Sequence, residues 1–169
     1  MRRSIILLLA FTVTLALTAV PVSAGPKVEA SGSWWYYPTF VSEPAFRGQN
    51  VFLYGSDIGF WEGTFTGSHE EEFDVVCHFG SGISLYKGEM TFTGTVEDET
   101  GALRSGTMVI KMNGKVDAVA PDCGPIFDTD WHGHWVIIGG TGELEDVHGH
   151  GTFTGPSGLL YYEGQVHFS

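Results

Sequence analysis

Two His-Gly-His triplets are the part of the 169-residue sequence that most resembles a metal site. His132 and His134 form the first triplet, and His148 and His150 form the second. Alternate residues of a β-strand project from the same face, so each triplet would present two imidazoles together. If the glycine-rich turn between them centres near Gly142, His134 lies opposite His150, with Cβ atoms about 4.5–5.5 Å apart.

A zinc site needs three or four ligands, and outward strand positions ordinarily carry polar residues such as histidine. We therefore expect no cofactor. A surface zinc or copper ion held by His132, His134, His148 and His150 is the minor alternative.

Other reactive residue types form weaker patterns. Cys77 and His78 are neighbours, but adjacent strand residues face opposite ways. The acidic run within Ser68–Phe73 lacks the ligand spacing of a calcium loop and is interpreted as a solvated turn. The chain has no G-x-S-x-G, H-E-x-x-H, P-loop or Rossmann motif. An enzyme is thus less expected than a binding protein, and no catalytic residue is assigned.

Residues 1–24 have the three parts of a secretory signal peptide. Arg2 and Arg3 are basic, Ile5–Val20 is apolar, and small residues precede a cleavage point after Ala24. This pattern predicts a secreted, periplasmic or cell-surface protein with no stable membrane insertion after cleavage. A single domain, residues 25–169, would remain, which is enough chain for one hydrophobic core.

The mature chain is strongly acidic. Without Arg2 and Arg3, 6 of the 8 Lys and Arg remain against 20 Asp and Glu, a net charge of −14. Such a charge repels phosphate backbones, so the sequence predicts that the protein does not bind nucleic acid. Two cysteines, Cys77 and Cys123, predict one disulfide in an exported protein.

Apolar and polar residues alternate with a period of two over several segments, which is typical of half-buried strands. The clearest are Trp61–Gly67, Tyr86–Gly94, Gly106–Met112 and Leu160–Phe168. Their apolar faces mix aromatic residues with glycines, as the curved interior of a small barrel requires. The sequence predicts an all-β fold, an antiparallel β-barrel of roughly eight strands.

Connections are expected at Pro38–Arg47, after a first strand at Trp34–Tyr37, at Val96–Gly106, and at Val119–Pro125.

The inferred inward face carries enough aromatic residues either to fill the interior or to line a ligand cavity. The cavity candidates are Trp61, Phe65, Tyr86, Phe92, Trp131, Trp135, Phe153 and Tyr162.

Three stretches, "GFWEGTFTG", "YKGEMTFTGTVEDETGALRSGTMVIKMNGKV" and "GTGELEDVHGHGTFTGPSGLLYYEGQVHF", resemble a family of uncharacterised bacterial small barrels. This family is similar to the allene oxide cyclase and dirigent barrels. The resemblance implies an eight-stranded antiparallel barrel with a small apolar cavity, often oligomeric in the plant members. It transfers no catalytic residue to this chain.

The leading hypothesis is an exported barrel that binds a small apolar molecule. One alternative is a cofactor-free cyclase or isomerase that acts through the shape of its cavity. Another is a structural or interaction protein without a ligand. A homo-oligomer is compatible with all three.

Overall fold

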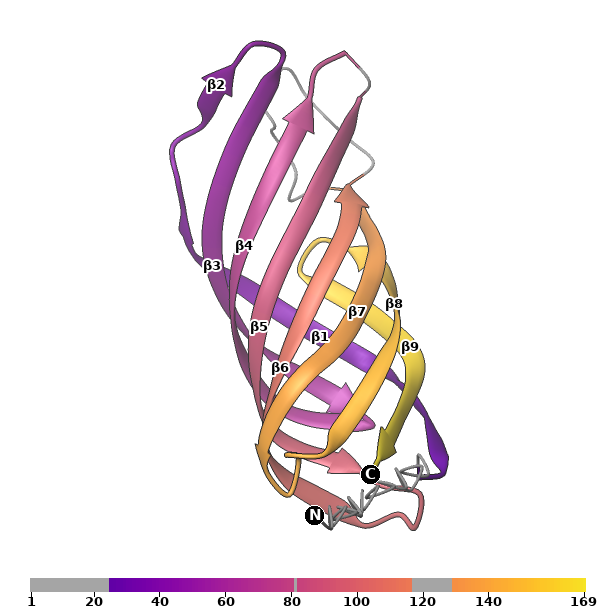
Figure 1. Ribbon diagram of the computed structural model, residues 1–169. Coiled ribbons are helices and arrows are strands. Elements are labelled where there is room, and N and C mark those ends of the chain that lie inside the picture. The colour runs from indigo at the N-terminus through magenta and orange to yellow at the C-terminus, as the bar shows by residue number, and fades with distance from the viewer. Residues whose placement is uncertain (1–24, 81, 117–128) are drawn as a thin grey trace, which may run out of the picture.

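The computed structural model describes residues 25–80, 82–116 and 129–169, which form one antiparallel sheet (Figure 1). The strands are β1 (Lys27–Val41), β2 (Ala45–Arg47), β3 (Asn50–Gly63), β4 (Phe65–His78), β5 (Ile83–Glu97), β6 (Leu103–Val116), β7 (Asp130–Gly142), β8 (Val147–Pro156) and β9 (Leu159–Phe168). Their order in the sheet is β1-β9-β8-β7-β6-β5-β4-β3-β2. The predicted all-β antiparallel fold is confirmed.

The sheet closes into a ring because β1 pairs on both of its sides. One edge of β1 bonds to β9 and the other to β3, so that Trp34 faces Leu160 on one side and Trp61 on the other. Eight strands complete the ring, and the short β2 adds to the free part of β3. Figure 1 shows the strands winding obliquely around a common interior.

Alternation along each strand separates the interior from the outer surface. Trp34 is 1% exposed, whereas its neighbour Trp35 is 39% exposed, because consecutive strand residues point to opposite faces. The same two-residue rhythm buries alternate residues of β3 and β4 throughout their lengths. A continuous apolar core therefore fills much of the ring.

The segment Trp61–Gly67 is a tight connection and not the single strand that its alternation predicts. β3 ends at Gly63 and β4 begins at Phe65, so Trp61 pairs with Gly67 across the hairpin. Gly63 has a φ of 108°, which residues with a side chain rarely adopt. The GTFTG motif at this position forms the turn between β3 and β4. The side chains of Trp61 and Phe65, on either side of Gly63, still point inward.

Two further predictions about connections are wrong. The acidic run Ser68–Phe73 lies in the middle of β4, fully paired with β3 and β5. The segment Pro38–Arg47 includes the end of β1 and the whole of β2. In both places the charged or proline residues suggested a loop. Strand formation there depends more on pairing with the neighbouring strands than on local composition.

The predicted turn within Val96–Gly106 is confirmed. It joins β5 to β6, and the Asp98 carboxylate holds it together. Asp98 accepts hydrogen bonds from the backbone N–H groups of Thr100 and Ala102, at 2.8 and 3.0 Å, and from Arg104 Nε at 2.8 Å. The Thr100 hydroxyl also donates to Asp98 at 2.6 Å, and this bond, followed by those from Arg104 and the backbone, lowers the pKa of the Asp98 carboxyl.

Some sequence predictions lie outside the described residues: the signal peptide 1–24, the Val119–Pro125 loop and Cys123. In the described part of the chain, no helix is long and apolar enough to cross a membrane.

Candidate functional site

One region of the interior is packed solid with aromatic rings. Trp34 stacks on Trp61 with ring centroids 4.4 Å apart, and Phe65 stacks on Tyr162 at 5.0 Å. The Tyr162 hydroxyl accepts a hydrogen bond from the Phe65 backbone N–H at 2.9 Å, and burial raises its pKa to about 12. Six predicted cavity residues are buried without lining the cavity described below: Trp61, Phe65, Phe92, Trp135, Phe153 and Tyr162.

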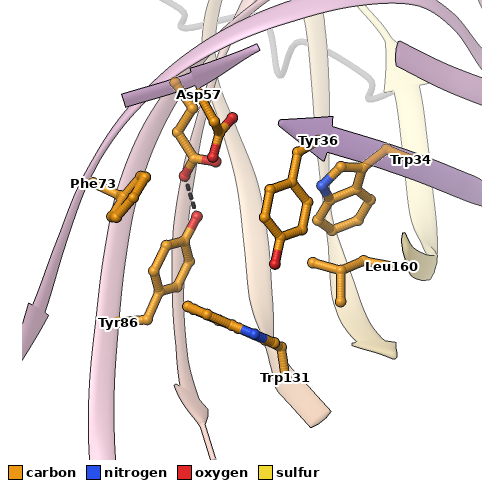
Figure 2. A pocket seen from close by; sticks show the side chains of 8 residues that line it. Trp34, Tyr36, Asp57, Phe73, Tyr86, Trp131 and Leu160 are labelled. Carbon is orange, nitrogen blue, oxygen red and sulfur yellow. Dashed lines mark hydrogen bonds between the residues drawn. The ribbon is translucent and has the colours of Figure 1, made fainter. Parts of the chain in front are cut away.

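The other two predicted cavity residues, Tyr86 and Trp131, border a small internal cavity that we call the chamber. Figure 2 shows the side chains around it, which come from β1, β3, β4, β5, β7 and β9. The complete lining is Trp34, Tyr36, Asp57, Glu71, Phe73, Tyr86, Trp131 and Leu160. The centre of a water-sized molecule can move within about 20 Å³ of the chamber, which is enough for water or one compact group.

Two carboxyl groups lie side by side on the wall of the chamber. Asp57 on β3 and Glu71 on β4 are direct cross-strand partners, which places their side chains side by side on the inner face. Asp57 is 4% exposed and Glu71 is 5% exposed. Buried carboxyl groups at such a position are costly unless hydrogen bonds or an opposite charge compensate them.

A chain of hydrogen bonds supports Asp57. The Trp61 indole N–H donates to His69 Nδ1 at 3.0 Å, and His69 Nε2 lies 3.1 Å from Asp57 Oδ1. An indole nitrogen can only donate, so Nδ1 must be the acceptor and carries no proton. The ring is therefore the neutral Nε2–H tautomer, and it donates its one N–H to Asp57. Opposite His69 stands Gly59, where a Cβ would lie 2.5 Å from the imidazole carbon Cε1.

The Tyr86 hydroxyl donates to Glu71 Oε1. The two side chains meet diagonally between β4 and β5 because Gly88 leaves the space that they occupy. A Cβ at Gly88 would collide with Glu71 Oε1 and lie 2.6 Å from the Tyr86 hydroxyl. A glycine is thus required where the two polar groups meet.

The protonation of these groups is shifted by their surroundings. Burial, together with the charge of Asp57, raises the pKa of Glu71 well above its ordinary value, against the lowering effect of the Tyr86 hydrogen bond. Burial and the neighbouring Glu71 carboxylate likewise raise the pKa of Tyr86. Burial also raises the pKa of Tyr36, whose hydroxyl lies 3.2 Å from Ser157 Oγ. The chamber therefore favours the uncharged forms of Glu71, Tyr86 and Tyr36.

Asp57, His69 and Glu71 also have the donor types of a metal centre, since one ligand atom from each lies within 4.8 Å of the others. A metal-bound histidine normally donates its second N–H to a neighbouring acceptor. His69 instead accepts a hydrogen bond at Nδ1, so binding through Nε2 would require an imidazolate. The hydrogen bond from Trp61 thus favours a polar cluster over a metal site.

The tautomer of His69 can be measured. Nitrogen-15 NMR of the labelled protein at neutral pH should show His69 protonated at Nε2, and the exposed His148 supplies a solvent-exposed reference. The Trp61→Phe substitution removes the donor to Nδ1 and should weaken the preference for that tautomer, which the hydrogen bond from Nε2–H to Asp57 still favours. A proton found on Nδ1 of His69 in the unsubstituted protein would contradict the assignment.

The four histidines of the His-Gly-His triplets lie on the outer face and are exposed. The expected opposition of His134 and His150 is wrong: His134 pairs with Thr152, and His150 pairs with Val136. The β7–β8 hairpin is centred on Glu143 and not on Gly142. Each β7 residue therefore pairs with a β8 residue two positions further along the chain than expected. His148 instead stacks on His167, with ring centroids 5.3 Å apart. Among the described residues, these histidines do not form a group of three close ligands.

Sequence reasoning missed Asp57, His69 and Glu71. The signal was present, because alternation continued from Phe65 places His69, Glu71 and Phe73 on one face. Asp57 shares the face of Trp61 by the same counting. Because Glu70 and Glu72 make the segment strongly acidic, the sequence alone indicates a solvated turn and not a strand.

Comparisons with known proteins give the fold but not an activity. No family model and no curated protein matches the sequence. Among solved structures, the chain is similar to a protein of unknown function of the DUF3224 family from Shewanella oneidensis MR-1. The TM-score is 0.61 at 15% sequence identity, over 85% of this chain and 98% of the other. At this level of identity the likeness shows a shared β-rich fold and nothing further.

Proposed function

We propose that this protein is exported and binds a small, mostly apolar molecule in the chamber. The observation that carries the proposal is an internal cavity whose apolar wall is interrupted by convergent polar groups. The sequence resemblance to allene-oxide-cyclase-like barrels implies a small apolar cavity, which is the kind of ligand site proposed here. The metal alternative on the outer histidines has weaker support, because their register does not bring three ligands together.

The lining indicates what kind of molecule fits. Trp34, Phe73, Trp131 and Leu160 supply apolar surface, whereas Tyr86 and the carboxyl groups supply hydrogen-bonding partners at one side. The lining contains no Lys or Arg, so a phosphate or carboxylate ligand would meet uncompensated negative charge. A molecule without negative charge that places one compact group, such as a branched alkyl head, in the chamber is the best match.

A branched neutral alcohol, 3,3-dimethylbutan-1-ol, is a suitable probe. Titration followed by the intrinsic tryptophan fluorescence, to which Trp34 and Trp131 of the lining contribute, and by NMR of the alcohol methyl groups should show saturable binding. Leu160→Phe fills the chamber and should weaken binding at least about tenfold, whereas Leu159→Phe, at the next position on β9, should not. Binding that is unaffected by Leu160→Phe, in a variant that is still folded, would place the ligand elsewhere.

A second candidate function is that of a cofactor-free isomerase. It is favoured by two buried carboxyl groups, Asp57 and Glu71, which line one chamber and have different hydrogen-bond partners. Such a pair can hold one proton and remove another. Conversion of the small aldehyde but-3-enal into its conjugated isomer but-2-enal, followed by ultraviolet absorbance, tests this. A rate that Glu71→Gln does not lower would exclude it.

Export carries its own prediction. Cys77 is fully buried on β4, and its proposed partner Cys123 lies outside the described residues. Peptide mapping of the secreted protein without reductant should recover a Cys77–Cys123 crosslink. Closing a loop of this length stabilises a fold by about 4 kcal/mol in the chain-entropy model, so reductant should lower the free energy of unfolding by that order. Two free thiols in the secreted protein would contradict the prediction.

A further inference from the structure

The chamber is lined by two buried carboxyl groups and by no cationic side chain. Every Lys and Arg in the described part of the chain is exposed on the outer face: Lys27, Arg47, Lys87, Arg104, Lys111 and Lys115. Neither Asp57 nor Glu71 forms an ion pair with any of them. His69 contributes no charge, because the hydrogen bond from Trp61 keeps its Nδ1 unprotonated.

Each carboxyl group uses only part of its hydrogen-bonding capacity. Asp57 accepts one bond at Oδ1 from His69, and Glu71 accepts one at Oε1 from Tyr86. In the described residues, the second oxygen of each group has no protein partner. Both groups line the chamber and both are more than nine-tenths buried. Two under-satisfied carboxyl groups at one cavity favour a ligand that brings positive charge.

Aromatic rings form the rest of the wall. Trp34, Tyr36, Phe73, Tyr86 and Trp131 line the same chamber as the carboxyl groups, and Figure 2 shows Phe73 and Tyr86 on the side where Asp57 lies. Tyr86 and Trp131 meet edge to face with ring centroids 5.2 Å apart, and Phe73 lies 6.3 Å from Tyr86. A cation within about 6 Å of an aromatic face is attracted by the ring, and several such rings make the cages that bind quaternary ammonium groups.

We propose that the ligand of the chamber is a small organic cation, a protonated or methylated amine. This inference rests on the proposed binding function and specifies its ligand class. The aromatic rings contact the apolar substituents on nitrogen, and the free oxygens of Asp57 and Glu71 supply the opposite charge. A metal ion is a poorer occupant than an organic cation, because it would need a lone pair on His69 that the Trp61 hydrogen bond already occupies.

Choline and 3,3-dimethylbutan-1-ol make a matched pair of probes, since they have the same shape and differ in one positive charge. Calorimetric titration of the full mature chain should show choline binding at least about tenfold more tightly than the alcohol. Glu71→Gln and Asp57→Asn keep the size of each side chain and an oxygen that can accept its hydrogen bond, and each should reduce this preference several-fold. Glu72→Gln, on the outer face of the same strand, should leave it unchanged.

The outcomes separate the two proposals. Equal affinity for choline and the alcohol would overturn the cation inference while leaving the proposed binding function intact. Failure of both probes to bind would overturn both. Zinc that displaces choline, and whose binding requires His69, would replace the organic cation with a metal ion.

Discussion

Trp34→Ala should lower the free energy of unfolding by about 3–5 kcal/mol, as expected for truncating a fully buried aromatic side chain. Trp34 is 1% exposed, stacks on Trp61 and also contacts Phe153 edge to face, with centroids 5.4 Å apart. It lies where β1 joins β3 and β9, so its loss leaves a cavity at the closure of the ring. Domains of this size are stable by only about 5–15 kcal/mol, so the variant should be markedly more sensitive to urea.

Trp35→Ala is the matched control, since it removes the same side chain from the next position of the same strand. Trp35 points outward and is 39% exposed, so the expected loss is about 1 kcal/mol or less. Urea unfolding followed by circular dichroism measures both variants. Equal losses would contradict the inward direction of Trp34 and, with it, the strand register that closes the ring.

This pair also shows how far the sequence could predict the fold. Period-two alternation and inward glycines are local properties of the chain, and they suffice to predict strands, their faces and an all-β class. Gly94 and Gly67, for example, are paired at a place where a Cβ on either would lie 2.7 Å from the Cα of the other. Such close approach explains why aromatic residues alternate with glycines on the inner face.

The chamber was less accessible to prediction, because it depends on pairing between strands. Asp57 meets Glu71 because the tight corner at Gly63 determines the β3–β4 register. When the same corner is interpreted as continuous strand, the two acids are never brought together. The bond from Trp61 to His69 then depends on the orientations of two side chains, which alternation does not specify. Residue faces were therefore predictable, whereas the hydrogen-bonded cluster was not.

Glu71→Gln should make the protein more stable at neutral pH, by an amount that grows as the pH rises. Burial and the charge of Asp57 raise the pKa of Glu71 in the folded protein above its value in the unfolded chain. Below the unfolded value, about 4.3, both states are protonated and the group has no effect. Above it, the unfolded chain releases the proton first, so stability falls with rising pH until the folded pKa is passed.

Each unit by which the folded pKa is raised costs about 1.4 kcal/mol at high pH, and the Glu71→Gln variant avoids that cost. The side-chain amide introduced by this substitution keeps an oxygen that accepts the Tyr86 hydrogen bond, so packing should change little. Urea unfolding between pH 4 and 9 should give curves that coincide at the acid end and diverge toward the alkaline end. Glu72→Gln should stay within about 0.5 kcal/mol of the unsubstituted protein throughout, because Glu72 is exposed.

Asp57→Asn tests the cause of the pH dependence. Desolvation of Glu71 is the larger cause of its raised pKa and remains in this variant, whereas the repulsion from the Asp57 carboxylate disappears. The fall in stability with rising pH should therefore become shallower without vanishing. Parallel curves for the unsubstituted protein and Asp57→Asn would show that the two carboxyl groups do not interact. A pH-independent Glu71→Gln difference would show that folding does not raise the pKa of Glu71. The same coupling gives a reason for the chamber to take up positive charge, since a bound cation would stabilise both carboxylates together.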